Sequence, residues 1–235
     1  MAVEIAPTLE LMLHIYSLSR EGGPDSERFI AFGAAAADGR CIPGYNPMTG
    51  EPVADTISAM IELGAEGIAR AVATETAVVI GFNHDVTMYF TVAAPGMWTD
   101  RFGTEVEHRL KATRPESILL WFDDEITSEV IEREVRAQTV RLHEIVKRGG
   151  RPPETLEQAV DQEGRALALS GAVGTFDEKA ARILDEYRTD PSLATMVAFL
   201  YGDDDAAKLG YAPLDLTGRT GYDHAIHQYG DKSHP

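Results

Sequence analysis

Three consecutive acidic residues, Asp123, Asp124 and Glu125, are the first place in this sequence where chemistry could be concentrated. They end an apolar run, Ile118–Phe122, which is too short for a free helix and typical of a buried central strand. Ligands often bind beyond the ends of strands, where several side chains converge. Carboxylates there could hold Mg²⁺ or act as general acid and base, so we predict that Asp123 and Asp124 are catalytic.

A structural role for the same acids is the alternative. Asp124 could cap the long helix that we expect to begin at Asp124 or Thr127, and the acids beside it would complement the helix dipole. His108 keeps the catalytic hypothesis open. It lies on a short helix predicted from the capping-box pattern of Thr104 and Glu107, and this helix could approach the same strand end. We therefore add His108 to the catalytic candidates.

The C-terminal segment holds a second group of candidates. His224 and His227 are three residues apart, so they would share one face of a helix, and Asp223 could orient an imidazole ring. Imidazoles paired with a carboxylate can bind Zn²⁺ or a similar ion, which makes His224 and His227 the predicted metal ligands. The alternative is that they are solvated side chains near a mobile chain end. The sequence leaves the identity of any metal or cofactor open.

A loop rich in proline and glycine holds the third group. Residues 40–52 contain three prolines and two glycines, which excludes a helix and predicts a loop long enough to cover a pocket. Cys41, Tyr45 and Asn46 in this loop are the predicted ligand contacts. A nucleophilic Cys41 would need a nearby histidine, and the alternative is an inert, partly buried thiol. No nucleotide-binding glycine motif, nucleophile elbow, HExxH or CxxC pattern accompanies these groups in the sequence.

The elements that would position these groups predict an α+β fold, mostly helical, with a small sheet of about three strands in the N-terminal half. Ala77–Phe82 is rich in β-branched residues and Val86–Val92 alternates in polarity, so both ranges predict strands. Asn83–Asp85 between them favours a hairpin turn. With Ile118–Phe122 as the third strand, the sheet should be antiparallel or mixed.

Helices are expected on both sides of this sheet. Apolar spacing indicates one helix from about residue 55 to Thr74, and a capping pattern begins another at Thr155. The stiff segment Arg151–Pro153 is the predicted boundary between two parts of the chain. We expect an α+β domain at 1–150 and a helical extension packed on it at 151–235, with an irregular tail from about residue 210.

Composition limits the partners. The chain of 235 residues has a formal net charge of −17, and its acidic residues are spread evenly, with 19 in residues 1–125 and 19 in residues 126–235. Such a surface repels phosphate backbones and anionic lipid, so we expect neither nucleic acid nor a membrane as partner. No apolar run reaches the roughly 18 residues of a membrane span, and the single cysteine fits a reducing compartment. We therefore predict a cytoplasmic location.

Two classes of function remain. The first is a soluble cytoplasmic enzyme that acts on a small molecule with metal or carboxylate acid–base chemistry. The alternative is a non-catalytic interaction or regulatory protein that uses its helical C-terminal half to dimerise or to bind a partner. A small-molecule ligand and a second copy of the chain are the partners that these classes imply. The acids at a strand-to-helix junction favour the enzyme.

Overall fold

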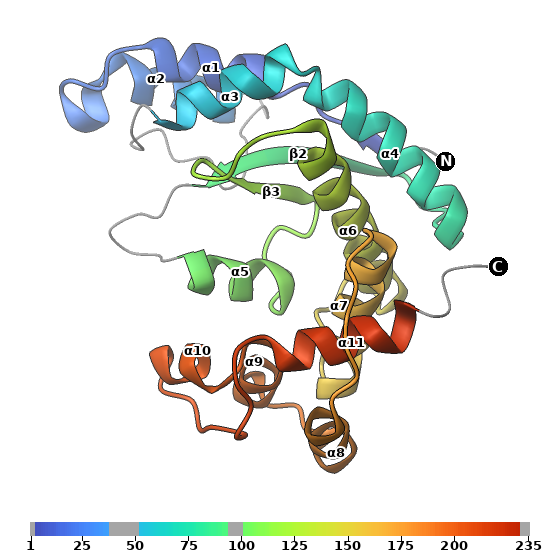
Figure 1. The fold of residues 1–235 in the computed structure, drawn as a ribbon. Helices are drawn as coiled ribbons and strands as arrows, with labels where there is room; N and C mark the ends of the chain where they lie inside the picture. Colours follow the sequence, from blue (N-terminus) through green and yellow to red (C-terminus); the bar gives the residue numbers. More distant parts are fainter. Residues whose placement is uncertain (1–2, 38–51, 94–100, 231–235) are drawn as a thin grey trace. The chain divides into compact units, whose positions relative to one another are not determined.

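The computed structural model of the protein describes residues 3–37, 52–93 and 101–230 (Figure 1). The chain divides into two compact units. The first, which we call the sheet unit, comprises Met1–Asp100 and Glu116–Val135. The second, the helical unit, comprises Arg101–Pro115 and Arg136–Pro235. Neither unit is a continuous stretch of chain, and these bounds differ from the predicted division at residue 150.

The sheet unit is built on three strands, β1 (Val3–Ile5), β2 (Val86–Ala93) and β3 (Ser117–Trp121), in the order β1-β2-β3. Both pairings are parallel, with β2 in the centre. The small three-stranded sheet among many helices confirms the predicted fold class, and β2 and β3 lie within one residue of their predicted bounds. The predicted antiparallel or mixed pairing is wrong.

The mistaken pairing comes from Ala77–Phe82, which we predicted to be the first strand of a hairpin. These residues form the end of α4 (Ala65–Ile80) and its C-terminal cap. Gly81 adopts a φ of 68°, and the Phe82 N–H donates to the Ala77 carbonyl oxygen at 2.8 Å, which closes the helix. A short apolar run fits a strand or a helix equally well, and here the preceding helix extends through it. The remaining strand, β1, has only three residues, too few for a periodic signal.

The helices that precede β2 are α1 (Leu9–Ser17), α2 (Glu27–Ala37), α3 (Pro52–Glu62) and α4, with a 3₁₀ turn, η1, at Gly23–Asp25. Helices α3 and α4 replace the single helix predicted there because Gly64 adopts a φ of 69°, a left-handed conformation that interrupts the helix. Glu66 in the first turn of α4 accepts hydrogen bonds from the N–H groups of Thr8 and Leu9, at 2.8 and 3.0 Å. A residue distant in sequence therefore caps the start of α1.

The helical unit contains α5 (Arg101–Arg109), the C-terminal part of α6 (Ser128–Lys147), α7 (Leu156–Leu169), α8 (Glu178–Tyr187), α9 (Leu193–Tyr201), α10 (Asp203–Lys208) and α11 (Thr220–Gly230). Thr155 begins α7 as predicted, since its side chain accepts a hydrogen bond from the Gln158 N–H at 3.3 Å. Helix α11 lies where we expected an irregular tail. Within the described ranges, every helix is too short or too polar to cross a membrane.

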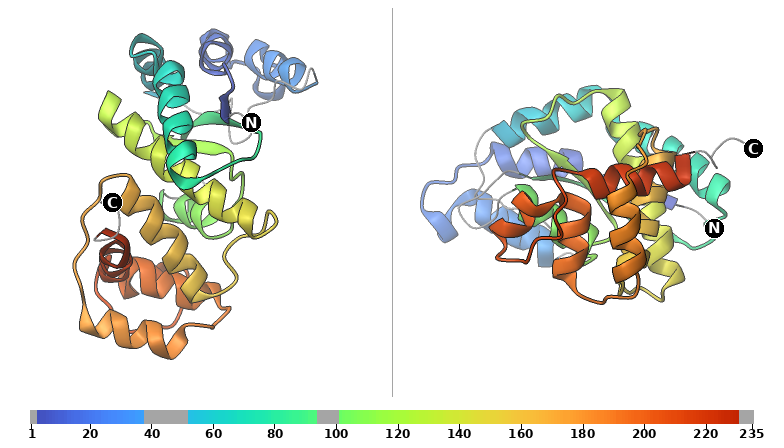
Figure 2. Two further views of the ribbon diagram at one scale, coloured as in Figure 1. Left: turned by 90° about the vertical axis from the view of Figure 1, so that its right-hand side faces the viewer. Right: turned by 60° about the horizontal axis from the view of Figure 1, so that its bottom comes forward.

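Two glycines bring α11 into direct backbone contact with its neighbours, α7 and α9 (Figures 1 and 2). A Cβ atom on Gly164 of α7 would lie 2.5 Å from the Ala225 carbonyl oxygen of α11. A Cβ atom on Gly221 of α11 would lie 1.9 Å from the Phe199 carbonyl oxygen of α9. Neither position has room for a side chain, so the two glycines set the spacing of these helices.

Candidate functional site

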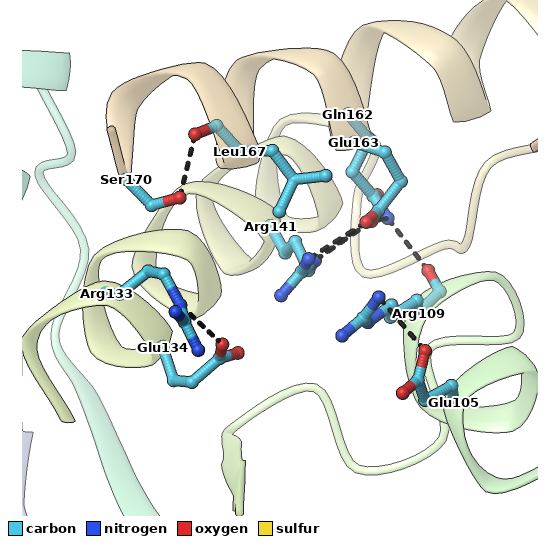
Figure 3. Close-up of polar contacts among 9 residues, drawn as sticks. All are labelled: Glu105, Arg109, Arg133, Glu134, Arg141, Gln162, Glu163, Leu167 and Ser170. Carbon is cyan, nitrogen blue, oxygen red and sulfur yellow. Dashed lines mark hydrogen bonds and ion pairs between the residues drawn. The ribbon is translucent and has the colours of Figure 1, made fainter. Parts of the chain in front are cut away.

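A buried ion pair joins α6 to α7 in the helical unit (Figure 3). Arg141 Nε and Nη2 donate to the two carboxylate oxygens of Glu163 at 2.9 Å each, and Nε lies 3.2 Å from the second oxygen. The side chains are 3% and 0% exposed. Taking both charges out of water is costly, and only such two-fold contact compensates for it. Burial raises the pKa of Glu163, but the charges of Arg141 and Arg109 and the hydrogen bonds outweigh it, so that the pKa is lowered overall.

Gln162 connects this ion pair to the end of α5. Its Nε2 donates to the Arg109 carbonyl oxygen at 2.8 Å and lies 3.3 Å from Glu163 Oε1 (Figure 3). Its own Oε1 accepts a hydrogen bond from Arg148 Nη2. Because both ends of the amide are engaged, Gln162 fixes the C-terminal end of α5 against α7.

Arg109 is the second guanidinium of this region. Its Nη1 lies 3.2 Å from Glu105 Oε2 one turn earlier on α5, an ion pair that lacks the angles of a hydrogen bond (Figure 3). The Arg109 side chain is 14% exposed. Burial by itself lowers the pKa of Arg109, yet the charge of Glu105 and the neighbouring tyrosines and Glu163 raise it well above its usual value. Arg109 therefore keeps a full positive charge.

Two buried tyrosines lie within reach of that charge. Tyr201 and Tyr222 are 4% and 1% exposed, and their ring centroids are 5.0 Å apart in an edge-to-face arrangement. The two hydroxyls lie close enough to each other that their contact lowers the pKa of Tyr222, but neither makes a hydrogen bond of ordinary geometry to a residue that the structure describes. Burial raises the pKa of both tyrosines, against a lowering by Arg109, so both hydroxyls stay protonated and can donate.

These residues form one buried polar cluster in the helical unit, drawn from α5, α6, α7, α9 and α11. We call it the arginine–tyrosine cluster and define it as Glu105, Arg109, Arg141, Gln162, Glu163, Tyr201 and Tyr222. Its rim is aromatic and cationic: the Phe102 ring lies 5.1 Å from that of Tyr201, and the exposed Arg219 guanidinium lies 4.3 Å from the Tyr222 ring centroid. Such a combination of donors and rings is suited to an anion with an apolar part.

The predicted catalytic acids lie in the sheet unit. Asp123 and Asp124 follow β3 in a turn, with Asp123 exposed and Asp124 half-buried. Thr127 is the residue that caps α6, since its hydroxyl oxygen accepts a hydrogen bond from the Val130 N–H at 3.3 Å. The structural alternative that Asp124 caps this helix is therefore wrong.

The other predicted residues are distributed differently. His108 is buried on α5, in the helical unit, so the three catalytic candidates are divided between the two units. Cys41, Tyr45 and Asn46 lie outside the described residues. No curated protein, protein-family model or solved structure that we compared with this chain matches it.

His224 and His227 lie together on α11, as their spacing predicted for a helix. The Phe176 ring contacts both imidazoles, at centroid distances of 5.5 and 5.8 Å. Both ring nitrogens of His224 have protein partners: Nδ1 lies 3.5 Å from the Asp177 N–H, and Nε2 lies 2.9 Å from Gln228 Nε2. Burial and then the charge of His227 lower the pKa of His224. In the part of the chain that is described, no three His, Cys, Asp or Glu side chains come together to hold a metal ion.

Sequence reasoning missed the arginine–tyrosine cluster altogether. Arg141 and Glu163 are 22 residues apart, and each lies within an amphipathic pattern where a charged residue normally marks the solvent face. The polar residues Gln138, Thr139, Arg141 and His143 of α6 are all buried, but only the structure shows this, so the sequence carried no local signal for the cluster.

Replacing Asp123 or Asp124 with Asn tests the catalytic role predicted for these acids. Asn keeps the shape of the side chain but removes the charge, so metal binding or proton transfer should be lost while stability changes by no more than about 0.5 kcal/mol. Thr127→Ala is the control, because losing the true cap should cost about 1 kcal/mol without affecting binding. Thermal unfolding and calorimetric titration with Mg²⁺, Mn²⁺ and Zn²⁺ measure both effects. If the parent binds one of these ions and both Asn variants bind it equally well, the predicted role is wrong.

Proposed function

We propose that this protein binds a small anionic molecule at the arginine–tyrosine cluster. The observation that carries the proposal is the pair of buried hydroxyls of Tyr201 and Tyr222, which lack a hydrogen-bond partner of ordinary geometry among the described residues. A buried donor left unsatisfied costs about 1–3 kcal/mol, and buried polar groups in native proteins are nearly always paired. An oxygen atom of a ligand that accepts from both hydroxyls would remove this cost.

The hydrogen-bond donors of the cluster favour an anion over a neutral ligand. The carboxylates of Glu105 and Glu163 also lie near the tyrosines, and the donors there are the protonated hydroxyls themselves and the Arg109 guanidinium, whose raised pKa keeps it charged. A guanidinium and neutral O–H groups together match a carboxylate or a tetrahedral oxyanion, which can only accept. The rings of Phe102, Tyr201 and Tyr222 would contact the apolar part of such a molecule.

Binding of this kind fits the first functional class expected from the sequence, a cytoplasmic enzyme acting on a small molecule. His108 lies next to Arg109 on α5 and is the titratable residue through which we propose that acid–base chemistry would act. The alternative class, an interaction protein, is favoured by one separate observation. Val173 and Phe176, between α7 and α8, are 91% and 60% exposed, and large exposed apolar side chains often contact partners.

Replacing either tyrosine hydroxyl with hydrogen tests the proposal. In the absence of ligand, Tyr201→Phe and Tyr222→Phe should be as stable as the parent or more stable, because each removes a buried unsatisfied group. Both should weaken binding of anions by about tenfold, the loss expected for one hydrogen bond to a charged group. Tyr187→Phe, at a partly buried position on α8 of the same unit, is the control and should leave binding unchanged.

The measurement is thermal unfolding and calorimetric titration with a panel of acetate, benzoate, methanesulfonate, inorganic phosphate and sulfate. We expect at least one of these anions to raise the Tm of the parent in a saturable way, and to do so less in the two Phe variants. The proposal fails if no anion in the panel binds, or if the Phe variants bind as tightly as the parent.

A further inference from the structure

The segment that joins α7 to α8 lies directly on α11, and we call its residues 171–177 the α7–α8 loop. A Cβ atom on Gly174 of this loop would lie 2.1 Å from the Asp223 carbonyl oxygen and 2.6 Å from the His227 nitrogen, both backbone atoms of α11. Gly174 therefore has no room for a side chain. The loop and the helix touch through their backbones, and the side chains beside this contact hold the loop in place.

His224 of α11 makes a hydrogen bond between the two. Its Nδ1 lies 3.5 Å from the Asp177 nitrogen, in a long hydrogen bond that the ring can only accept, since Asp177 donates its backbone N–H. The proton of the neutral ring is therefore on Nε2, which lies 2.9 Å from the side-chain amide of Gln228. That amide accepts from Nε2 once its oxygen and nitrogen are exchanged. With the His224 side chain 2% exposed, the neutral ring satisfies both neighbours.

The same contact positions the start of α8. The Phe176 ring packs against the imidazoles of His224 and His227, at centroid distances of 5.5 and 5.8 Å. Asp177, the next residue, is the N-cap of α8, and its Oδ1 accepts a hydrogen bond from the Ala180 N–H at 2.7 Å. The His224 ring thus holds the end of the α7–α8 loop at the residue from which the next helix begins.

Protonation of the His224 ring would break this contact. A second proton, on Nδ1, turns the acceptor into a donor that faces the Asp177 N–H, so the hydrogen bond is lost and two donors oppose each other. The added charge would also be buried, which disfavours the protonated ring. Burial and then the charge of His227 accordingly lower the pKa of His224, against a smaller raising by Asp177 and Asp185.

The elements packed on α11 bring few other charges to the ring. Asp177 and Asp185 are the residues of α8 whose charges shift the pKa of His224, and α9 has no charged residue. The charged residues of α7 have partners elsewhere: Glu157 with Arg188, Asp161 with Tyr229, Glu163 with Arg141 and Arg165 with Glu144. Within α11, His227 shifts the pKa of His224, and the neighbouring Asp223 is exposed. The protonation state of the ring therefore depends on its burial and on these neighbours.

We propose that His224 is a pH-sensitive switch, whose neutral ring holds the α7–α8 loop against α11 and whose protonation in mildly acidic solution releases the loop. The proposal does not depend on the anion site. Release would uncover Ile226, which is 6% exposed and whose Cβ would lie 2.7 Å from a Cβ on Gly174. Together with Phe176, which is 60% exposed already, Ile226 would then form a larger apolar surface.

The direction of the pH dependence follows from linkage. In the released state the solvated His224 ring titrates near its ordinary pKa of 6.5, whereas in the held state the pKa is lower. The held state is therefore fully favoured above about pH 6.5. It loses this advantage as the pH falls from there through the lower pKa of the held ring, because the released state binds the proton more tightly.

Amide hydrogen exchange in the full chain, followed by NMR and corrected for the intrinsic pH dependence of exchange, measures how firmly the loop is held. The protection factor of the Asp177 N–H should fall about fivefold between about pH 7.5 and pH 5, the factor that corresponds to the net contribution of one hydrogen bond. Carboxylates stay mostly charged in this range while histidines titrate. The fall should have the same midpoint as the titration of the His224 ring C–H signals.

Two variants assign the effect to one histidine. His224→Asn keeps a neutral acceptor oxygen close to the position of Nδ1 but cannot be protonated in this range, so the Asp177 protection factor should be the same at both pH values. His227→Asn is the matched control, because it removes the other imidazole that contacts Phe176. The fall should persist in this control and its midpoint should move to higher pH, since the charge of His227 no longer lowers the pKa of His224.

A parent protein in which the Asp177 protection factor is the same at both pH values overturns the proposal. A fall that persists in His224→Asn, or one that disappears in His227→Asn, assigns the effect to another group and overturns it as well. If His224→Asn does not fold, the parent still decides, because midpoints that differ between the Asp177 protection factor and the His224 ring signals contradict the switch.

Discussion

Replacing Gly221 with Ala should destabilise the helical unit by about 3 kcal/mol or more, the upper range for overpacking a close contact. The added Cβ would lie 1.9 Å from the Phe199 carbonyl oxygen and 2.7 Å from its carbonyl carbon. These are backbone atoms of α9, so no side-chain rotation can relieve the clash and the two helices must move apart. Gly164→Ala should act in the same direction against α11, where the Cβ would lie 2.5 Å from the Ala225 carbonyl oxygen.

A glycine with open space around it provides the matched control. Gly67 lies within α4, and a Cβ there would meet no atom within 4 Å apart from its chain neighbours and the adjacent backbone of its own helix. Gly67→Ala should therefore stabilise its helix by about 1 kcal/mol, the usual advantage of Ala over Gly in a helix interior. Urea denaturation followed by circular dichroism measures both changes. A Gly221→Ala protein as stable as the parent would show that α9 and α11 are not in the close contact described.

The buried ion pair gives the second large effect. Glu163→Gln or Arg141→Met should cost about 3–5 kcal/mol, because each leaves a buried charge without its partner. Replacing both residues together, as Arg141→Met with Glu163→Leu, should recover most of that loss, since no uncompensated charge remains. The exposed pair of Arg188 and Glu157 is the control, where Glu157→Gln should cost no more than about 1 kcal/mol.

The same pair should be visible in the dependence of stability on pH. The pKa of Glu163 in the folded protein lies below its ordinary value of 4.5, so the carboxylate stabilises the fold above about that pH. This stability is lost as the pH falls through the folded-state pKa. As the pH is lowered from 5, the free energy of unfolding of the parent should therefore fall more than that of the double variant, in which the carboxylate is absent. Equal acid sensitivity of the two proteins, measured by urea denaturation at each pH, would contradict the role assigned to Glu163.

The sequence predicted those parts of the fold whose signal is local. The alternation of polarity over Val86–Val92, the apolar run of β3 and the cap at Thr155 all depend on neighbouring residues, and the structure agrees with them. The prediction of a strand at residues 77–80 was wrong because their apolar character suits a strand or a helix. Only the helix that begins at Ala65 decides between the two. The predicted direction of the strands was wrong for the same reason, and because β1 was too short to be detected.

The arginine–tyrosine cluster was beyond sequence reasoning for a different reason. Arg141, Glu163 and Tyr222 lie on three helices, and each residue alone resembles an ordinary surface or core side chain. Periodicity indicates which face of a helix is apolar, but not which buried positions of distant helices meet. Asp123 and Asp124 were noticed because they are adjacent in the sequence, and adjacent residues are the pattern that sequence analysis detects most easily.

The insertion of α5 between β2 and β3 has a consequence for the protein as it leaves the ribosome. Arg109 is synthesised about 110 residues before Tyr222, so at typical translation rates α5 emerges roughly 5–20 s before α11 exists. During that interval α5 depends on contacts within itself, and the ion pairs of Glu105 with Arg101 and Arg109, at 3.6 and 3.2 Å, are of that kind. A helix of nine residues is marginal by itself, so these ion pairs would favour its helical conformation until the later helices enclose it.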